Sequence, residues 1–271
     1  MRGILWAFIL SVFGVQAEAQ TINVSSGTLD QIFHFPSKHV DPRPVLIWLP
    51  EGYSFEKKYD VLYMHDGQQL FDSSFTWNQQ SWNVDEVVGE MMAQDKVRDF
   101  IVVAVFNNGK FRHSEYFPQK PIEQLSERNR DIVYKARRSV QTPYFSEKVV
   151  SDRYLKFLVE ELKPYIDENY SVNSNRESTF VMGSSMGGLI SMYALSEYPD
   201  VFAGAACLST HWPGVGNVNE NPVPEAFYKY VREHFPDAGR HKVYFDHGTE
   251  TLDALYPPLQ KKVDKIMREK G

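Results

Sequence analysis

One segment in the second half of the chain constrains the fold more than any other. A β-rich run, 179–182, passes directly into the pentapeptide 183–187, which reads G-S-S-M-G, and an apolar helical pattern begins at Leu189. In the order strand, tight turn, helix, a G-x-S-x-G turn holds its central serine on a strained backbone, clear of the sheet. The flanking positions must be glycine, because a Cβ atom there would collide with neighbouring segments. We therefore predict that Ser185 is a nucleophile and that the N–H of Met186 lies in its oxyanion hole.

Apolar runs alternate with helical patterns along the whole chain. The runs cover residues 45–49, 61–64, 100–106, 179–182, 202–208 and 243–245. Runs that are apolar almost throughout are typical of strands buried on both faces of a mostly parallel sheet. Residues 29–35 alternate instead, which predicts an antiparallel edge strand. The 271 residues show no repeat or linker. The sequence thus predicts one doubly wound α/β domain over residues 20–271.

A second turn follows the run 61–64 and reads His65-Asp66-Gly67-Gln68. Gly67 lets the backbone approach a ligand closely. We predict that the N–H of Gly67 or Gln68 is the second oxyanion donor, since this fold takes one from the corresponding turn. His65 precedes the serine in the chain, so we expect it to order the turn rather than act as a base.

The stretch 107–150 departs from the alternation of strand and helix. It carries many charged residues, three prolines and little periodicity. A connection of this length in a compact domain is usually functional or mobile. Two interpretations stay open: a lid or wall of the substrate cleft, and a solvated excursion with a helix or two.

The first 19 residues are typical of a cleaved secretory signal. Arg2 supplies a positive start, residues 4–13 are almost wholly apolar, and Ala17 and Ala19 are small residues two apart. The apolar run is too short to span a bilayer. We expect cleavage after Ala19 and a secreted or periplasmic protein without stable membrane insertion; an N-terminal membrane anchor is the alternative.

The charge and the cysteine content exclude some classes of protein. The formal net charge is −6 and the basic residues are scattered, so no patch indicates nucleic-acid binding. Cys207 is the only cysteine, which rules out an intramolecular disulfide. It lies in an apolar run, and we expect it to be a small buried side chain. The sequence says nothing of the oligomeric state.

Several motifs together carry a family resemblance. They are His65-Asp66-Gly67-Gln68, Leu70-Phe71-Asp72, Trp82 near Asp85, Gly183 to Leu189, Tyr198-Pro199 and Phe202. This set resembles the putative esterase family of α/β-hydrolases, which includes esterase D, enterochelin esterases, feruloyl and acetyl-xylan esterases and the antigen 85 mycolyltransferases. Arg112, Glu115-Tyr116 and Pro118 favour the enterochelin-esterase-like branch. The resemblance implies ester hydrolysis through Ser185 without a metal or organic cofactor.

The family also implies an acidic residue after the strand 243–245. Glu250 is our first choice, because it lies in the loop beyond Gly248, where this family tends to place its acid. Asp246 and Asp253 are the rival positions.

Other side chains are expected at the same edge of the sheet and could contact substrate. They are His65, Asp66, Trp82, His211 and Trp212. We expect a small-molecule or carbohydrate ester as substrate, with carbohydrate, feruloyl-type and siderophore esters as the candidates.

The sequence contains no histidine after Glu250, where α/β-hydrolases carry their base. A serine hydroxyl is a poor nucleophile without a base. Three hypotheses follow: the chain is a fragment that lacks the last strand, His211 or His247 substitutes, or the protein binds an ester or sugar without cleaving it. An acyltransferase on the same scaffold is a further alternative.

Overall fold

The computed structural model describes residues 21–216, 220–236 and 239–271. The signal predicted for residues 1–19 lies outside these residues and stays a prediction. The strands are β1 (Thr28–Phe35), β2 (Arg43–Leu49), β3 (Asp60–His65), β4 (Phe100–Val105), β5 (Thr179–Ser184), β6 (Gly204–Leu208) and β7 (Lys242–Phe245). The helices are α1 (Val84–Ala93), α2 (Arg112–Tyr116), α3 (Gln119–Glu123), α4 (Glu127–Lys135), α5 (Ser151–Lys156), α6 (Lys163–Asn169), α7 (Met186–Glu197), α8 (Val223–His234) and α9 (Pro257–Glu269). Short helical turns complete the chain: η1 (Gly67–Gln69), η2 (Ser73–Phe75), η3 (Gly109–Phe111), η4 (Phe157–Leu162), η5 (Arg176–Ser178) and η6 (Thr251–Leu255).

The seven strands form one sheet in the order β1-β2-β4-β3-β5-β6-β7. β1 and β2 pair antiparallel, as do β2 and β4, and the pairs from β4 to β7 are parallel. All the strands predicted from the sequence are present, and β1 is the antiparallel edge strand expected from its alternation. The predicted α/β-hydrolase class, with a mostly parallel sheet and helices on both faces, is confirmed.

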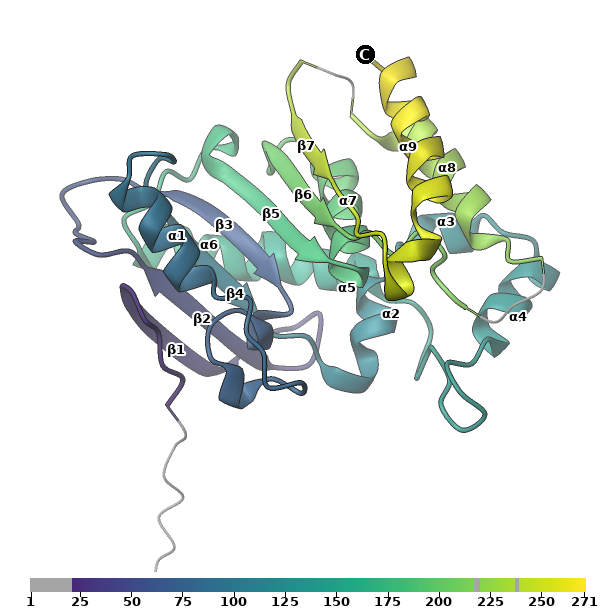
Figure 1. Ribbon diagram of the computed structural model, residues 1–271, viewed down its shortest axis with the longest axis horizontal. Helices are drawn as coiled ribbons and strands as arrows, with labels where there is room; N and C mark the ends of the chain where they lie inside the picture. Colours follow the sequence, from purple (N-terminus) through teal and green to yellow (C-terminus); the bar gives the residue numbers. More distant parts are fainter. Residues whose placement is uncertain (1–20, 217–219, 237–238) are drawn as a thin grey trace, which may run out of the picture.

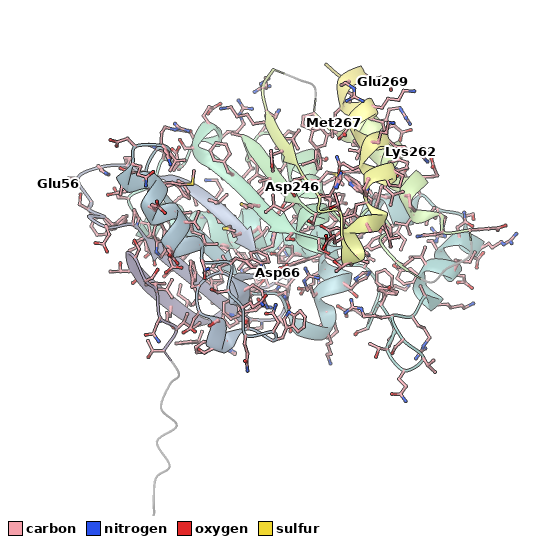
Figure 2. The ribbon with its side chains drawn as sticks, viewed as in Figure 1. Glu56, Asp66, Asp246, Lys262, Met267 and Glu269 are labelled. Atoms are coloured by element: carbon pink, nitrogen blue, oxygen red, sulfur yellow. The ribbon has the colours of Figure 1, made fainter. Side chains whose placement is uncertain are left out.

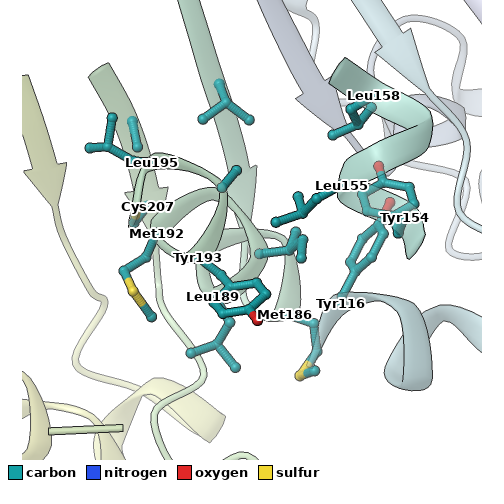
Figure 3. Packing of buried hydrophobic residues seen from close by; sticks show 14 of the residues in the cluster. Tyr116, Tyr154, Leu155, Leu158, Met186, Leu189, Met192, Tyr193, Leu195 and Cys207 are labelled. Atoms are coloured by element: carbon teal, nitrogen blue, oxygen red, sulfur yellow. The ribbon is translucent and has the colours of Figure 1, made fainter. Parts of the chain in front are cut away.

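Helices pack on both faces of the sheet (Figure 1). α1 covers β2 and β4 on one face, where Val84 joins a core with Leu46, Trp48 and Val102. The opposite face is larger and lies under the helices from α5 to α9. Figure 3 shows this packing around α7, in which Cys207 is a fully buried side chain, as predicted.

On the α1 side, the sheet is open from β5 to β7 (Figure 1). An apolar groove of about 420 Å³ runs over this part of the sheet and includes Phe180, Ala206 and Tyr244. Val243 is 36% exposed and Tyr244 is 57% exposed. The expectation that residues 243–245 form a strand buried on both faces is therefore wrong. β7 lies at the edge of the described sheet, and no described helix covers this face of it.

A helix that spans a membrane must be long and apolar. No helix within residues 21–216, 220–236 and 239–271 is long and apolar enough to cross a bilayer.

Candidate active site

The turn between β5 and α7 has the strained geometry that the sequence predicts. Ser185 has φ 61° and ψ −114°, a conformation that L-residues rarely adopt. A Cβ atom on Gly183 would lie 2.7 Å from the backbone of Gly187. One on Gly188 would lie 2.9 Å from the hydroxyl of Thr210. Gly183 and Gly188 are therefore needed, because other backbone and side-chain atoms approach this turn closely. Ser185 directly precedes α7.

The end of β6 is tied directly to this turn. The N–H of Ser185 donates to the carbonyl of Leu208 over 2.8 Å, and the N–H of His211 donates to the carbonyl of Ser185 over 3.2 Å. The two loops therefore form one rigid edge, which fixes the serine relative to the residues that follow β6.

Tyr256 lies beside the Ser185 side chain, and His211 lies beside Tyr256. The Tyr256 hydroxyl is close enough to the Ser185 side chain to be influenced by it, and it lies 2.8 Å from Nδ1 of His211. Burial and the carboxylate of Asp253 raise the pKa of Tyr256 to about 12. Burial, with the nearby cations of Arg112 and Arg138, lowers the pKa of His211 to about 4. Both groups are neutral at pH 7.

The turn after β3 faces the serine turn across the edge of the sheet. Asp66 has a left-handed backbone (φ 59°) and directly precedes η1. A Cβ atom on Gly67 would lie 2.6 Å from the backbone of Ala104 at the end of β4, so glycine is required there. The N–H of Trp82 donates to the carbonyl of Gln69 over 2.8 Å. Trp82 is 38% exposed, and this bond ties its backbone to the end of η1.

The three candidate acids occupy different surroundings. Glu250 is exposed, and its side chain does not cap the helical turn η6 that it precedes. Oδ1 of Asp246 accepts from the N–H of Ser209 over 3.0 Å. Oδ2 of Asp253 accepts from the hydroxyl of Ser209 over 2.6 Å and from the N–H of Gly248 over 2.8 Å. The carboxylate of Asp253 also raises the pKa values of Tyr256 and His211. Glu250 as the catalytic acid stays a prediction, with Asp246 and Asp253 as its rivals.

The side chains predicted to contact substrate differ in how far they are exposed. The side chains of His65 and Trp212 are fully buried, so the geometry gives no support to substrate contact at these two positions. His65 lies 2.8 Å from the Tyr154 hydroxyl, and burial lowers its pKa to about 3. Nε1 of Trp212 donates to Gln260 over 2.7 Å. Asp66 and His211 are almost buried at 3% and 8% exposure. For Trp82, substrate contact stays a prediction.

Nothing in the sequence predicted a role for Tyr256 or Asn107, and Arg112 was noted only as part of the family resemblance. The guanidinium of Arg112 forms two hydrogen bonds with the carboxylate of Asp66, and Asn107 forms a third. Arg112 and Asn107 belong to the 107–150 stretch, whose helix α2 is largely buried. Its first part is therefore a packed wall behind the oxyanion turn, whereas residues 137–143 are exposed.

Within residues 21–216, 220–236 and 239–271, no three His, Cys, Asp or Glu side chains gather closely enough to hold a metal ion.

Comparison with known families gives one match that covers most of the chain. The model of the Putative esterase family matches residues 39–255. This protein belongs to the Putative esterase family. The matched region contains the Ser185 turn, the Asp66–Gln68 turn and all three candidate acids, so the family assignment rests on the part of the chain that forms the site.

Curated relatives of this esterase-family protein include two from Bacillus subtilis (strain 168). "Uncharacterized protein YbbA" is 25% identical over 172 residues, which are 63% of this chain and 58% of the relative. "Uncharacterized protein YjcH" is 21% identical over 177 residues, which are 65% of this chain and 59% of the relative. Each match spans less than two thirds of the relative's own length.

Solved structures similar to this esterase-family chain share its fold. A ferulic acid esterase has a TM-score of 0.57 at 21% identity, with 90% of this chain and 86% of that one covered. The BES protein from Bacillus cereus has a TM-score of 0.63 at 17% identity, with 93% and 86% covered. The enterobactin esterase FES from Shigella flexneri has a TM-score of 0.55 at 14% identity, with 90% and 51% covered. At these identities the likeness concerns the fold.

Proposed function

We propose that this protein is an exported serine esterase that hydrolyses carboxylic esters through an acyl-enzyme on Ser185. The observation that carries the proposal is the strained Ser185 turn, which Gly183 and Gly188 permit and which faces the Asp66–Gln68 turn. Membership of the Putative esterase family supports it. The signal-like residues 1–19 support export.

In the proposed reaction, Oγ of Ser185 attacks the ester carbonyl and the alcohol leaves. The negative charge that develops on the carbonyl oxygen is stabilised by the N–H of Met186 and by an N–H from Gly67 or Gln68. Water then attacks the acyl-enzyme, which releases the acid and restores the serine.

The proton of Ser185 has a weak acceptor nearby. Tyr256 lies beside the Ser185 side chain and contacts His211, but a histidine with a pKa of about 4 is a poor base at neutral pH. We therefore expect activated esters, whose alcohol leaves readily, to react much faster than unactivated ones. The same observation favours a second candidate function, a protein that binds an ester or sugar without cleaving it.

We propose esters of sugars, feruloyl-type acids or catechol siderophores as substrates. The structural neighbours include a ferulic acid esterase and an enterobactin esterase, and Trp82 offers an exposed ring beside the oxyanion turn. Stacking on such a ring suits aromatic acids and sugar faces alike.

The test compares Ser185→Ala with Ser184→Ala on p-nitrophenyl acetate. Ser184 ends β5 and pairs with β6, so it controls for changes at the same turn. We expect Ser185→Ala to lower kcat/KM about 1000-fold and Ser184→Ala to stay within about threefold of the wild type. Mass spectrometry should find the acetyl group on Ser185. Equal rates in the wild type and Ser185→Ala would overturn the esterase proposal, and binding of methyl ferulate without turnover would then support the second candidate.

A further inference from the structure

Asp66 combines a buried charge with an unusual backbone. Its residue is 3% exposed and its φ of 59° lies in the left-handed region, where glycine or asparagine is more common. The side chain does not cap η1, the helical turn that directly follows Asp66. A buried carboxylate is costly unless it is paired, so its partners explain why aspartate stands at this position. In the view of Figure 2, Asp66 is labelled near the middle of the molecule, whereas Glu56 and Glu269 are labelled near its outline.

Two side chains hold this carboxylate. Nε and Nη2 of Arg112 donate to its two oxygens over 2.6 and 2.7 Å, and Nδ2 of Asn107 donates to Oδ1 over 2.7 Å. The N–H of Asp66 donates to the Tyr116 hydroxyl over 3.3 Å. The two-pronged contact fixes the plane of the carboxylate as well as its position.

The same carboxylate adjoins both halves of the predicted oxyanion hole. On one side, the N–H of Asn107 donates to Oε1 of Gln68 over 3.2 Å, which links the carboxylate to the turn after β3. On the other side, a Cβ atom on Gly187 would lie 3.3 Å from Oδ2 of Asp66. Gly187 follows Met186, so the carboxylate lies against the start of α7.

The helix that carries Arg112 is itself firmly anchored. Glu115 of α2 forms a buried ion pair with Arg43 at the start of β2, with contacts of 2.7 and 2.8 Å. The hydroxyl of Ser114 donates to the carbonyl of Glu147 over 3.0 Å. α2 therefore holds Arg112 in a fixed position relative to Asp66.

We infer that Asp66, neutralised by Arg112, positions the two halves of the oxyanion hole relative to each other. This inference rests on the proposed esterase function, and it makes Asp66 and Arg112 positioning residues. It also gives Arg112 an electrostatic role. Without Arg112, the carboxylate of Asp66 would be an unpaired negative charge close to the developing oxyanion.

Two consequences separate this role from ordinary packing. Removing Arg112 alone should slow catalysis more than removing both charges, because the double change leaves no unpaired carboxylate. The loss should fall on kcat and not on KM, since the oxyanion forms only in the transition state.

The experiment measures kcat and KM on p-nitrophenyl acetate for Arg112→Gln, Asp66→Asn and the double variant. We expect Arg112→Gln to lower kcat about 100-fold, as loss of an oxyanion donor does, with KM within about threefold. Adding Asp66→Asn to Arg112→Gln should recover about tenfold in kcat. Asp60→Asn is the matched control: it removes an Arg98–Asp60 contact of 2.8 Å at the other end of β3 and should leave kcat unchanged.

Arg112→Lys provides a second test in case Arg112→Gln does not fold. It keeps the charge but not the two-pronged contact, and we expect about tenfold lower kcat with an unchanged unfolding midpoint. Wild-type kcat in Arg112→Lys and Arg112→Gln, or a double variant no faster than Arg112→Gln, would overturn the inference. Undiminished activity in Ser185→Ala would instead overturn the esterase proposal, so the two failures are distinguishable.

Discussion

At Ser185 the backbone conformation costs of the order of 1–3 kcal/mol and persists only because its surroundings impose it. β6 and the loop that follows it supply that constraint: Leu208 accepts a hydrogen bond from the N–H of Ser185, and the N–H of His211 donates to its carbonyl. The serine hydroxyl is therefore presented by a rigid turn, while the side chains that modify its chemistry come from other loops.

His211 is the residue whose titration the structure predicts most directly. Burial and the cations of Arg112 and Arg138 disfavour its imidazolium form, and only Asp253 opposes them. We expect its ring protons to titrate near pH 4 in NMR, with the signal assigned by comparison with His211→Asn. The pH–rate profile should accordingly show no inflection from His211 between pH 5 and 8. A midpoint above pH 6 would contradict this account.

The residues of the site differ in how far the sequence could predict them. The Ser185 turn was predictable because its constraints are local: its glycines and its strand and helix are adjacent in the chain. Arg112 and Tyr256 were not, since each lies about 70 residues from Ser185 and reaches the site through tertiary packing. Glu250 was preferred over Asp253 only because of its position in the family. In the structure Glu250 is exposed, whereas Asp253 is half-buried and accepts a hydrogen bond from Ser209.

At the scale of elements, α2 shows how a short helix can be well ordered. Five residues are too few for an isolated helix in water, so tertiary contacts must hold it. Arg112, Ser114, Glu115 and Tyr116 each form a hydrogen bond to another part of the chain. Such a helix leaves no periodic signal, which explains why the sequence of residues 107–150 supported two interpretations.

The buried pair of Arg43 and Glu115 should dominate the stability of this element. Its side chains are 2% and 4% exposed, so Glu115→Ala would leave a buried, unpaired guanidinium. We expect a loss of about 3–5 kcal/mol in the free energy of unfolding, measured by urea denaturation. Glu225→Ala is the control, because it removes an exposed pair with Lys262 and should cost less than about 1 kcal/mol. Equal losses in the two variants would contradict the expected difference.

At the scale of the whole molecule, buried histidines couple folding to pH. Burial lowers the pKa of His65 from 6.5 to about 3, although Asp66 raises it in part. Above about pH 6.5 both states are neutral at His65, and its contribution to stability is complete. As the pH falls from there toward 3, the unfolded chain binds a proton that the folded protein does not, so stability is lost.

This coupling is measurable with His65→Gln. Between pH 6.5 and 5, we expect the wild type to lose about 1.5 kcal/mol more than the variant in the free energy of unfolding. The comparison uses the difference between two pH values, so a change in the variant's overall stability does not affect it. Parallel pH dependences in the two proteins would show that His65 is not buried in its neutral form.

The exposed edge of the sheet at β7 affects how the protein refolds. The strands were predictable because short runs of three to seven mostly apolar residues have few other structures available. Their burial depends on what lies above them, which no local pattern records. β7 presents exposed apolar side chains, Val243 and Tyr244, along an edge whose backbone groups have no neighbouring strand among the described residues. Such an edge templates the addition of strands from other molecules. During refolding, self-association along this edge should therefore compete with folding. The yield of folded protein should be higher when the protein is refolded at lower concentration.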